Sequence, residues 1–259
     1  MREKMTDDEK FKKLRRFNGF MAVLHFIQGL LMVYLSNDFA IEVTTSYIGG
    51  PPGTSVEFMQ TEILFELPVG LAVAAFLFIS AIAHFVVSTF GYSWYKRNLK
   101  NHVNRARWIE YSFSSSLMIV VIGMLVGITD IGFLIVLSLV NASMILFGWL
   151  METYNQRTEK VVWTPFIFGC IAGIAPWIAI AGKLLTITTY SEAAIPDFVL
   201  WIFVSIAIFF NIFALNQLLQ YKKVGPWKDY LYGERMYIIL SLVAKSALAW
   251  QVFSGTLAG

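Results

Sequence analysis

Charged residues are scarce in this chain of 259 residues. Asp, Glu, Lys and Arg make up 14% of it and hydrophobic residues 57%, whereas soluble domains contain about 25% charged residues. The mean hydropathy is +0.64. This composition excludes an ordinary soluble domain and predicts a protein embedded in the lipid bilayer of the cell membrane. The net charge of +3 reflects basic loops, so we expect no nucleic-acid partner.

The chain also has a single cysteine, Cys170, within an apolar segment. It cannot form an internal disulfide, so cysteine usage indicates no compartment. The first apolar segment, Phe17 to Leu35, is longer than the core of a secretory signal and lacks a small-residue cleavage site after it. We therefore expect it to remain as a membrane span.

Apolar segments of about 20 residues, the length a bilayer requires, recur to the end of the sequence. They predict an all-α bundle of seven transmembrane helices that forms a single domain over residues 1–259. Residues 1–16 are expected to be a basic tail. The expected spans are 17–36, 64–92, 101–127, 131–151, 163–186, 197–221 and 230–256.

Basic residues predict the orientation of this bundle. All of the 20 basic residues except Lys183 and Lys245 fall in the N-terminal tail or in alternate loops. Because positive loops remain in the cytoplasm, we expect a cytoplasmic N-terminus and an extracellular C-terminus. In the first extracellular loop, residues 37–63, two β-branched segments flank Gly49-Gly50-Pro51-Pro52-Gly53. This pattern predicts a β-hairpin, which could cap the bundle or contact a partner chain.

Lys245 lies in the middle of the last apolar segment. A lone ammonium there costs at least about 2.5–3.5 kcal/mol. A desolvated lysine amine can form a Schiff base with a carbonyl compound, so covalent occupation would explain the position. Pairing with an acid from another helix, for structure or ion passage, explains it equally well.

Three other ionisable residues are expected at the depth of Lys245. The helical rise places Lys245, His25, His84 and Glu110 about 12–15 Å from the cytoplasmic side, with Glu110 at that depth only if its helix starts near Lys100. Glu110 would be the counter-ion of a cation on Lys245, and the histidines would accept protons. Ser80, one turn before His84, could order water. We expect no metal site.

Other polar and aromatic residues in the spans have both structural and functional interpretations. Arg107, one turn before Glu110, could tune that carboxylate or simply anchor the helix end. Glu152 and Asn141 could extend a cytoplasmic polar cavity or mark a helix end and a buried hydrogen bond. Trp108 and other aromatics could line an apolar slot or pack the core. Since the third span has no second carboxylate, vectorial proton pumping is not favoured.

Several sequence strings resemble the heliorhodopsins, a family of retinal-binding rhodopsins with inverted topology. They are SLVAKSALAWQ at 241–251, RWIEYSFSSS at 107–116, NASMILFGWL at 141–150, GCIAGIAPW at 169–177 and GGPPGT at 49–54. The resemblance implies all-trans retinal bound to Lys245 as a protonated Schiff base and isomerised by light to 13-cis. It also implies Glu110 as counter-ion and His25, His84 and Ser80 around a proton-accepting cavity. Positions implied near the chromophore are Ser115, Ser116, Asn141, Met144, Trp177, Phe210 and Ser241.

Together these observations predict a light-sensing photoreceptor that is not an enzyme. The resemblance implies a homodimer, to which the first extracellular loop contributes, and an unidentified cytoplasmic signalling partner. One alternative is a light-driven or light-gated ion transporter or channel. Another is a chromophore-free transporter that uses Lys245 and Glu110 as an ion pair.

Overall fold

The fold is known from a computed structural model that describes residues 6–192 and 195–257. Within these residues, seven helices are long and apolar enough to cross a membrane, as the sequence predicted. Arg2 and Lys4 of the expected tail, and Ala258 and Gly259 of the expected extracellular end, lie outside the described residues. The spanning helices are α1 (Asp7–Leu35), α2 (Val69–Ser88), α4 (Arg105–Leu125), α5 (Ile131–Asn155), α6 (Thr164–Tyr190), α7 (Asp197–Tyr221) and α8 (Tyr230–Val252).

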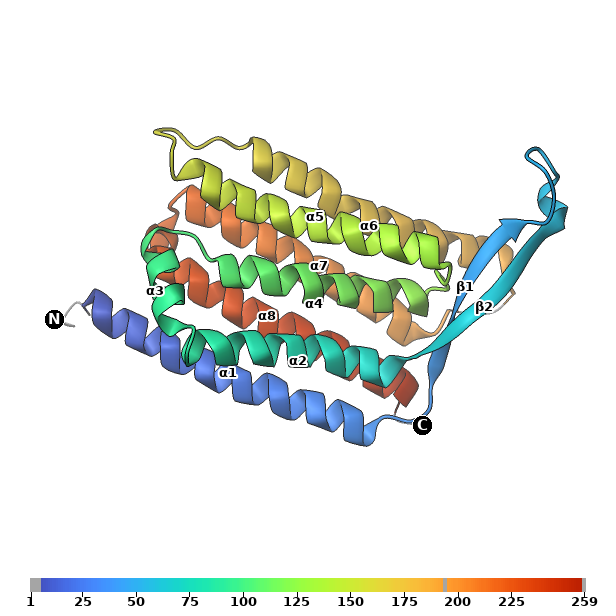
Figure 1. Cartoon of the computed structure of the whole chain (residues 1–259), viewed down its shortest axis with the longest axis horizontal. Helices are drawn as coiled ribbons and strands as arrows, with labels where there is room; N and C mark the ends of the chain where they lie inside the picture. Colours follow the sequence, from blue (N-terminus) through green and yellow to red (C-terminus); the bar gives the residue numbers. More distant parts are fainter. Residues whose placement is uncertain (1–5, 193–194, 258–259) are drawn as a thin grey trace.

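The helices lie side by side, and the short helix α3 (Tyr92–Lys100) crosses one end of the bundle (Figure 1). The predicted hairpin, β1 (Ala40–Ile48) and β2 (Met59–Pro68), projects from the opposite end. We call these the α3 end and the hairpin end. Because the number of spans is odd, α1 begins at the α3 end and α8 finishes at the hairpin end (Figure 1).

Several helix boundaries differ from those expected. Helix α1 begins at Asp7, ten residues before the expected span, because Thr6 and Glu9 form a capping box ahead of a charged first turn. Helix α2 begins only at Val69, since β2 stays paired with β1 through Pro68. The last span ends in a π-helical turn, Phe253–Leu257.

The expected span 101–127 is also shorter than predicted. The polar segment before it forms α3, the chain turns at His102 with a positive φ of 53°, and α4 begins at Arg105. Asn104 caps α4 by accepting a hydrogen bond from the Arg107 N–H at 3.0 Å. The helix that carries Glu110 therefore starts five residues later than the depth argument assumed.

The hairpin confirms the turn prediction and continues further than the expected loop. Its strands pair antiparallel with an irregularity between Val43 and Thr44. Thr44 N–H donates to the Thr129 carbonyl at 2.9 Å, and Ser46 N–H donates to Asp130 Oδ2 at 3.0 Å. Because Asp130 also caps α5, these bonds attach the hairpin to the start of that helix. A short 3₁₀ turn, η1 (Val56–Phe58), precedes β2.

Two apolar clusters hold the bundle together. The larger one fills the hairpin half and includes Phe76, Leu77, Ile119 and Leu248, all fully buried. The smaller one closes the α3 end with side chains from α1, α3 and α8 and the last turns of α2: Phe11, Leu14, Met21, Val87, Tyr95, Leu99 and Ile238. The polar residues predicted to be functional lie between these clusters.

Candidate functional site

Lys245 is buried on α8, with 3% of its surface exposed. Its Nζ donates to Glu110 Oε1 at 3.0 Å and to Ser241 Oγ, one turn earlier on the same helix, at 2.8 Å. The ammonium also lies 4.9 Å from the centre of the Tyr111 ring. A buried amine with a carboxylate partner can remain charged, because each charge stabilises the other.

Glu110 is the carboxylate that the depth argument placed beside Lys245. It is 8% exposed, and Ser80 Oγ donates to the same Oε1 atom at 2.6 Å. Although α4 starts only at Arg105, the carboxylate is buried inside the bundle, and its depth in the membrane stays a prediction. The cluster around Tyr95 and Leu99 covers the α3 end, so an acid only one and a half turns into α4 is still sealed from the surface.

His25 and His84 lie together, from α1 and α2. Their rings stack with centroids 5.7 Å apart and planes 5° from parallel. His25 is fully buried, and among the described residues no side chain or backbone group hydrogen-bonds to either of its nitrogens. A buried imidazole without partners has spare capacity to bind water or a proton.

The hydrogen bonds of Asn18 define the tautomer of His84. Asn18 Nδ2 donates to the Leu14 carbonyl at 2.9 Å, which turns its Oδ1 toward His84 Nδ1 at 2.8 Å. Because an amide oxygen only accepts, neutral His84 must carry its proton on Nδ1. The other ring nitrogen, Nε2, is then the atom that can accept a second proton.

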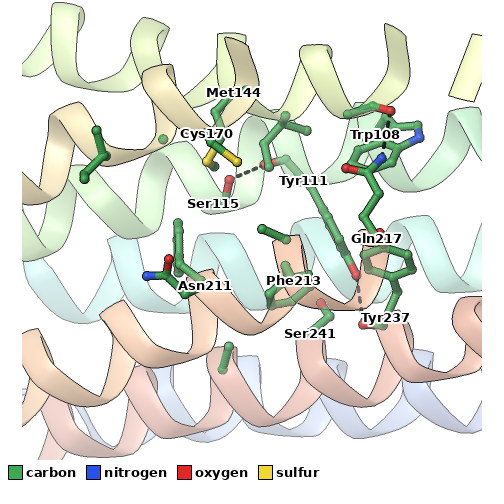
Figure 2. A pocket seen from close by; sticks show the side chains of 18 of the residues that line it. Trp108, Tyr111, Ser115, Met144, Cys170, Asn211, Phe213, Gln217, Tyr237 and Ser241 are labelled. Atoms are coloured by element: carbon green, nitrogen blue, oxygen red, sulfur yellow. Dashed lines mark hydrogen bonds between the residues drawn. The ribbon is translucent and has the colours of Figure 1, made fainter. Parts of the chain in front are cut away.

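A cavity of about 350 Å³ extends from Lys245 between α4, α5, α6, α7 and α8 (Figure 2). Trp177 forms part of its wall, with its ring edge-on to Phe210 at 5.4 Å. Gly173 lets Met144 approach, since an added Cβ would lie 2.5 Å from its sulfur. Of the predicted pocket residues, those lining the cavity are Trp108, Ser115, Met144, Trp177, Phe210 and Ser241.

The two remaining pocket residues lie just behind this wall. Asn141 Nδ2 donates to Ser115 Oγ at 2.8 Å and to Ser116 Oγ at 3.2 Å. They therefore position a lining side chain instead of lining the cavity themselves. An aromatic slot of this volume, within the usual range of about 300–1,000 Å³ for small-molecule sites, with a lysine amine at one end, fits a polyene aldehyde such as retinal.

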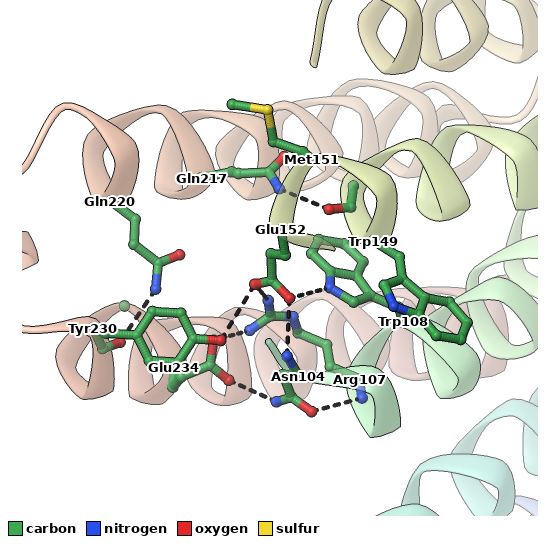
Figure 3. Close-up of polar contacts among 12 residues, drawn as sticks. Asn104, Arg107, Trp108, Trp149, Met151, Glu152, Gln217, Gln220, Tyr230 and Glu234 are labelled. Carbon is green, nitrogen blue, oxygen red and sulfur yellow. Dashed lines mark hydrogen bonds and ion pairs between the residues drawn. The ribbon is translucent and has the colours of Figure 1, made fainter. Parts of the chain in front are cut away.

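Arg107 and Glu152 belong to a second buried cluster nearer the α3 end (Figure 3). Arg107 Nη2 lies 2.5 Å from Glu152 Oε1, and Nη1 pairs with Glu234 Oε1. In the described part of the chain, the ion pairs of Arg107 thus lead to Glu152 and Glu234 and not to Glu110. We name Asn104, Arg107, Trp108, Glu152, Tyr230 and Glu234 the arginine cluster.

Glu234, which is 1% exposed, was missed by the sequence analysis because it adjoins Arg235 at the expected helix entry. A signal was present, however. Glu234, Ile238, Ser241 and Lys245 follow the helical repeat of three or four residues. This spacing puts Glu234 on the same face of α8 as Lys245, which points into the bundle.

Polar contacts of the first turn of α1 also hold the α3 end together. Lys96 of α3 donates to Asp8 Oδ1 at 2.8 Å. This hydrogen bond raises the pKa of the Lys96 ammonium above its usual range. Lys10 similarly donates to Asp229 Oδ2, just before α8, at 2.8 Å. These bonds attach the first turn of α1 to the segments that cover the polar residues.

Comparisons with solved structures show where this architecture occurs. The transmembrane domain of Salpingoeca rosetta rhodopsin phosphodiesterase superposes with a TM-score of 0.67 at 14% identity, over 95% of this chain and 85% of that one. The light-driven proton pump LR (Mac) from Leptosphaeria maculans gives 0.63 at 14% identity, over 97% of both chains. At this identity the likeness shows a shared microbial rhodopsin fold. Comparison with curated proteins gives no significant match.

The comparison with protein families is more specific. The family model of heliorhodopsins matches residues 14–257. This range includes the buried lysine, the hairpin and all the spanning helices apart from the first turns of α1. The match therefore covers the cavity, the Lys245–Glu110 pair and the arginine cluster together. The chain belongs to the heliorhodopsin family of light-sensing retinal proteins.

Proposed function

We propose that this protein is a photoreceptor in which Lys245 carries all-trans retinal through a protonated Schiff base. The observation that carries this proposal is the buried Lys245–Glu110 contact of 3.0 Å at the end of the 350 Å³ aromatic cavity. Retinal supplies the absorption of visible light and isomerises to 13-cis. Glu110 stabilises the positive charge on the Lys245 nitrogen, as a buried carboxylate does for a neighbouring cation.

The surroundings of Lys245 suggest how its nitrogen loses and regains a proton. Ser241 and Ser80 hold the Lys245 and Glu110 groups in place through hydrogen bonds of 2.8 and 2.6 Å. His84 offers Nε2 as an acceptor because Asn18 occupies the opposite nitrogen. His25, stacked on His84, offers two further buried nitrogens without hydrogen-bond partners among the described residues. Flash photolysis of the double variant His25→Ala, His84→Ala tests this role. An unchanged deprotonation rate of the Lys245 nitrogen would contradict it.

Reconstitution with retinal tests the attachment directly. The full chain, expressed with all-trans retinal, should show a visible absorption band that is absent in Lys245→Ala. Lys183→Ala, which removes an exposed lysine on α6, is the matched control and should keep the band. A band that survives in Lys245→Ala, or a wild-type protein that stays colourless, contradicts the proposal and favours the chromophore-free transporter.

We propose further that the protein transports no ion. Buried charged side chains, within the described residues, reach only from Lys245 to the α3 end, whereas the hairpin half is filled by apolar residues. A pump needs ionisable groups on both sides of the active proton. Light-induced photocurrents or pH changes in cells would contradict this proposal.

We also propose that the α3 end faces the cytoplasm. Basic residues gather there, among them Arg97, Lys100, Arg157, Lys222 and Lys223, and positive loops remain inside. The test is labelling of intact cells with a membrane-impermeant maleimide after Cys170→Ala. A cysteine placed at Gly53 in the hairpin turn should react, and one placed at Lys100 should not.

The expected homodimer is a proposal supported by the hairpin. The hairpin exposes Phe58 of η1 and Ile63 and Phe65 of β2, each at least half accessible, which is unusual for a hairpin that stays in water. We propose that these residues contact a second copy. Ile63→Lys should then convert a dimer to a monomer in light scattering with detergent correction, and an unchanged mass contradicts this.

The signalling partner is proposed to bind at the α3 end.

A further inference from the structure

The arginine cluster contains more carboxylates than cations. Arg107 pairs with both Glu152 and Glu234, all three being buried (Figure 3). If both acids are ionised, the cluster carries one net negative charge away from water. A buried excess charge of this kind is costly, and binding one proton would remove it.

Glu152 is the more completely hydrogen-bonded of the two acids. Its Oε1 accepts from Arg107 at 2.5 Å and from the Tyr230 hydroxyl at 3.4 Å. Its Oε2 accepts from the Asn104 N–H at 2.9 Å and from Trp108 Nε1 at 2.6 Å. Four donors satisfy both oxygens, and hydrogen bonds to the charged form favour that form.

Glu234 is less completely satisfied. Its Oε1 accepts from Arg107 and its Oε2 from Asn104 Nδ2 at 2.6 Å, and the Tyr230 hydroxyl also lies within hydrogen-bonding reach of this carboxylate. A carboxylate has about four lone-pair sites, so a proton can be added without displacing either bond. Glu234 therefore has room for a proton on its carboxylate, whereas four donors already occupy the oxygens of Glu152.

A small cavity connects Glu234 with the Lys245 site. It has a volume of about 40 Å³ and is lined by Glu234, Glu110 and His84, together with Arg107 and Asn18. A buried water needs about 10–15 Å³ and two to four polar partners. The cavity meets both conditions, whereas Glu152 does not line it.

We propose that Glu234 is the terminal acceptor of the proton that leaves the Lys245 nitrogen after illumination, and that His84 and water in the small cavity pass the proton on. The inference rests on the proposed function and extends it. The N–H bond at Lys245 breaks and an O–H bond forms on Glu234. The nitrogen and the carboxylate both become neutral, so the total buried charge is unchanged. Arg107 is left balanced by Glu152, and the one uncompensated negative charge moves from the arginine cluster to Glu110.

The groups that surround Glu234 come from several helices and agree with this role. The only cation facing it in the described residues is Arg107, which stays paired with Glu152 after the transfer. The other ionisable groups around it are Tyr95 of α3, His84 of α2, Glu110 and Tyr111 of α4, Glu152 of α5, and Tyr230 and Tyr237 of its own helix.

Infrared difference spectroscopy with isotope labelling tests the proposal on the full chain with retinal bound. In protein grown on ¹³C-glutamate, light should produce a positive carboxylic acid band that is shifted to lower frequency relative to unlabelled protein. In Glu234→Asp the acceptor is aspartate, so this band should no longer respond to the glutamate label. The matched control is Glu152→Asp, in which the band should still respond.

Each contrary result overturns the proposal. A band that still shifts in Glu234→Asp shows that another glutamate, such as Glu110, accepts the proton. In wild-type protein, deprotonation of the Lys245 nitrogen without any glutamic acid band shows that the histidines keep the proton. Prompt proton release to a pH-indicating dye also contradicts storage on Glu234, and needs no variant. Failure of the proposed function differs from all of these, because the protein then has no visible band.

Discussion

The two halves of the bundle differ in what they bury. From Lys245 to the α3 end, the interior holds Glu110, Arg107, Glu152 and Glu234. From Lys245 to the hairpin end, about 10 Å along α8, the interior is apolar and closely packed around Leu248 and Val252. The contrast teaches that two roles are separated along the membrane normal. The half at the α3 end holds the ionisable groups for the proposed proton transfer, and the hairpin half packs the helices together.

Removing Glu110 should have the largest effect on the polar half. Glu110→Gln leaves a cation on the Lys245 nitrogen without its partner, at a cost of about 3–5 kcal/mol. This shifts the nitrogen toward its unprotonated form by about 100-fold or more. We expect the visible band to be replaced by near-ultraviolet absorption at neutral pH. Glu66→Gln, on the exposed face of β2, should keep its colour. A visible band in Glu110→Gln would show that another group is the counter-ion.

Arg107 should matter more for stability than for colour. Arg107→Gln leaves Glu152 and Glu234 close together without a cation, which should lower the free energy of unfolding by about 3–5 kcal/mol. Arg105→Gln, two residues earlier and exposed, should change it by less than about 0.5 kcal/mol. Thermal denaturation in the same detergent measures both. Equal effects of the two substitutions would mean that the buried cluster contributes no special stability.

The apolar half should respond in the opposite way. Leu248→Ala removes a fully buried side chain and should lower stability by about 2–5 kcal/mol through the cavity it leaves. Because Leu248 lies outside the polar region, the deprotonation rate of the Lys245 nitrogen should stay within about twofold of wild type. Leu215→Ala, at an exposed position, is the matched control. A large kinetic effect of Leu248→Ala would break the proposed separation of the halves.

The smallest expected effect concerns the tautomer of His84. Asn18→Leu removes the acceptor of the Nδ1 proton and should cost about 1–3 kcal/mol of stability, because a buried donor loses its partner. His84 is then free to change tautomer or orientation, so proton transfer should slow severalfold while the absorption maximum changes little. Flash photolysis measures the rate, and an unchanged rate would show that Asn18 does not orient the ring.

The sequence predicts those features that depend on local pattern. The spans follow from apolar length, and the hairpin follows from Gly49 to Gly53 between β-branched segments. The meeting of Lys245 with Glu110 was also predicted, although the depth argument assumed a helix start near Lys100 and α4 begins at Arg105. What depth does not fix is rotation of a helix about its axis, which decides that Arg107 turns toward Glu152 and Glu234.

The misplaced start of the third span has a related cause. The segment from Tyr92 to Lys100 is helical and amphipathic, unlike the almost uniformly apolar α2 before it. Its separation as α3 depends on the turn at His102 and on apolar contacts of Tyr95 and Leu99 with other helices. Contacts between segments far apart in the chain cannot be predicted from a single sequence. The burial of Glu110 beneath Tyr95 and Leu99 could therefore not be predicted either.

Arg107 and Glu110 share one turn of α4, about 4.5 Å apart along its axis. Glu110 holds Lys245 of α8, and Arg107 holds Glu234 of the same helix and Glu152 of α5. Two ion pairs between α4 and α8 are thus formed from a single turn of α4. The proposed proton transfer neutralises Lys245 and Glu234, so each of the two ion pairs loses one of its charges in the same event.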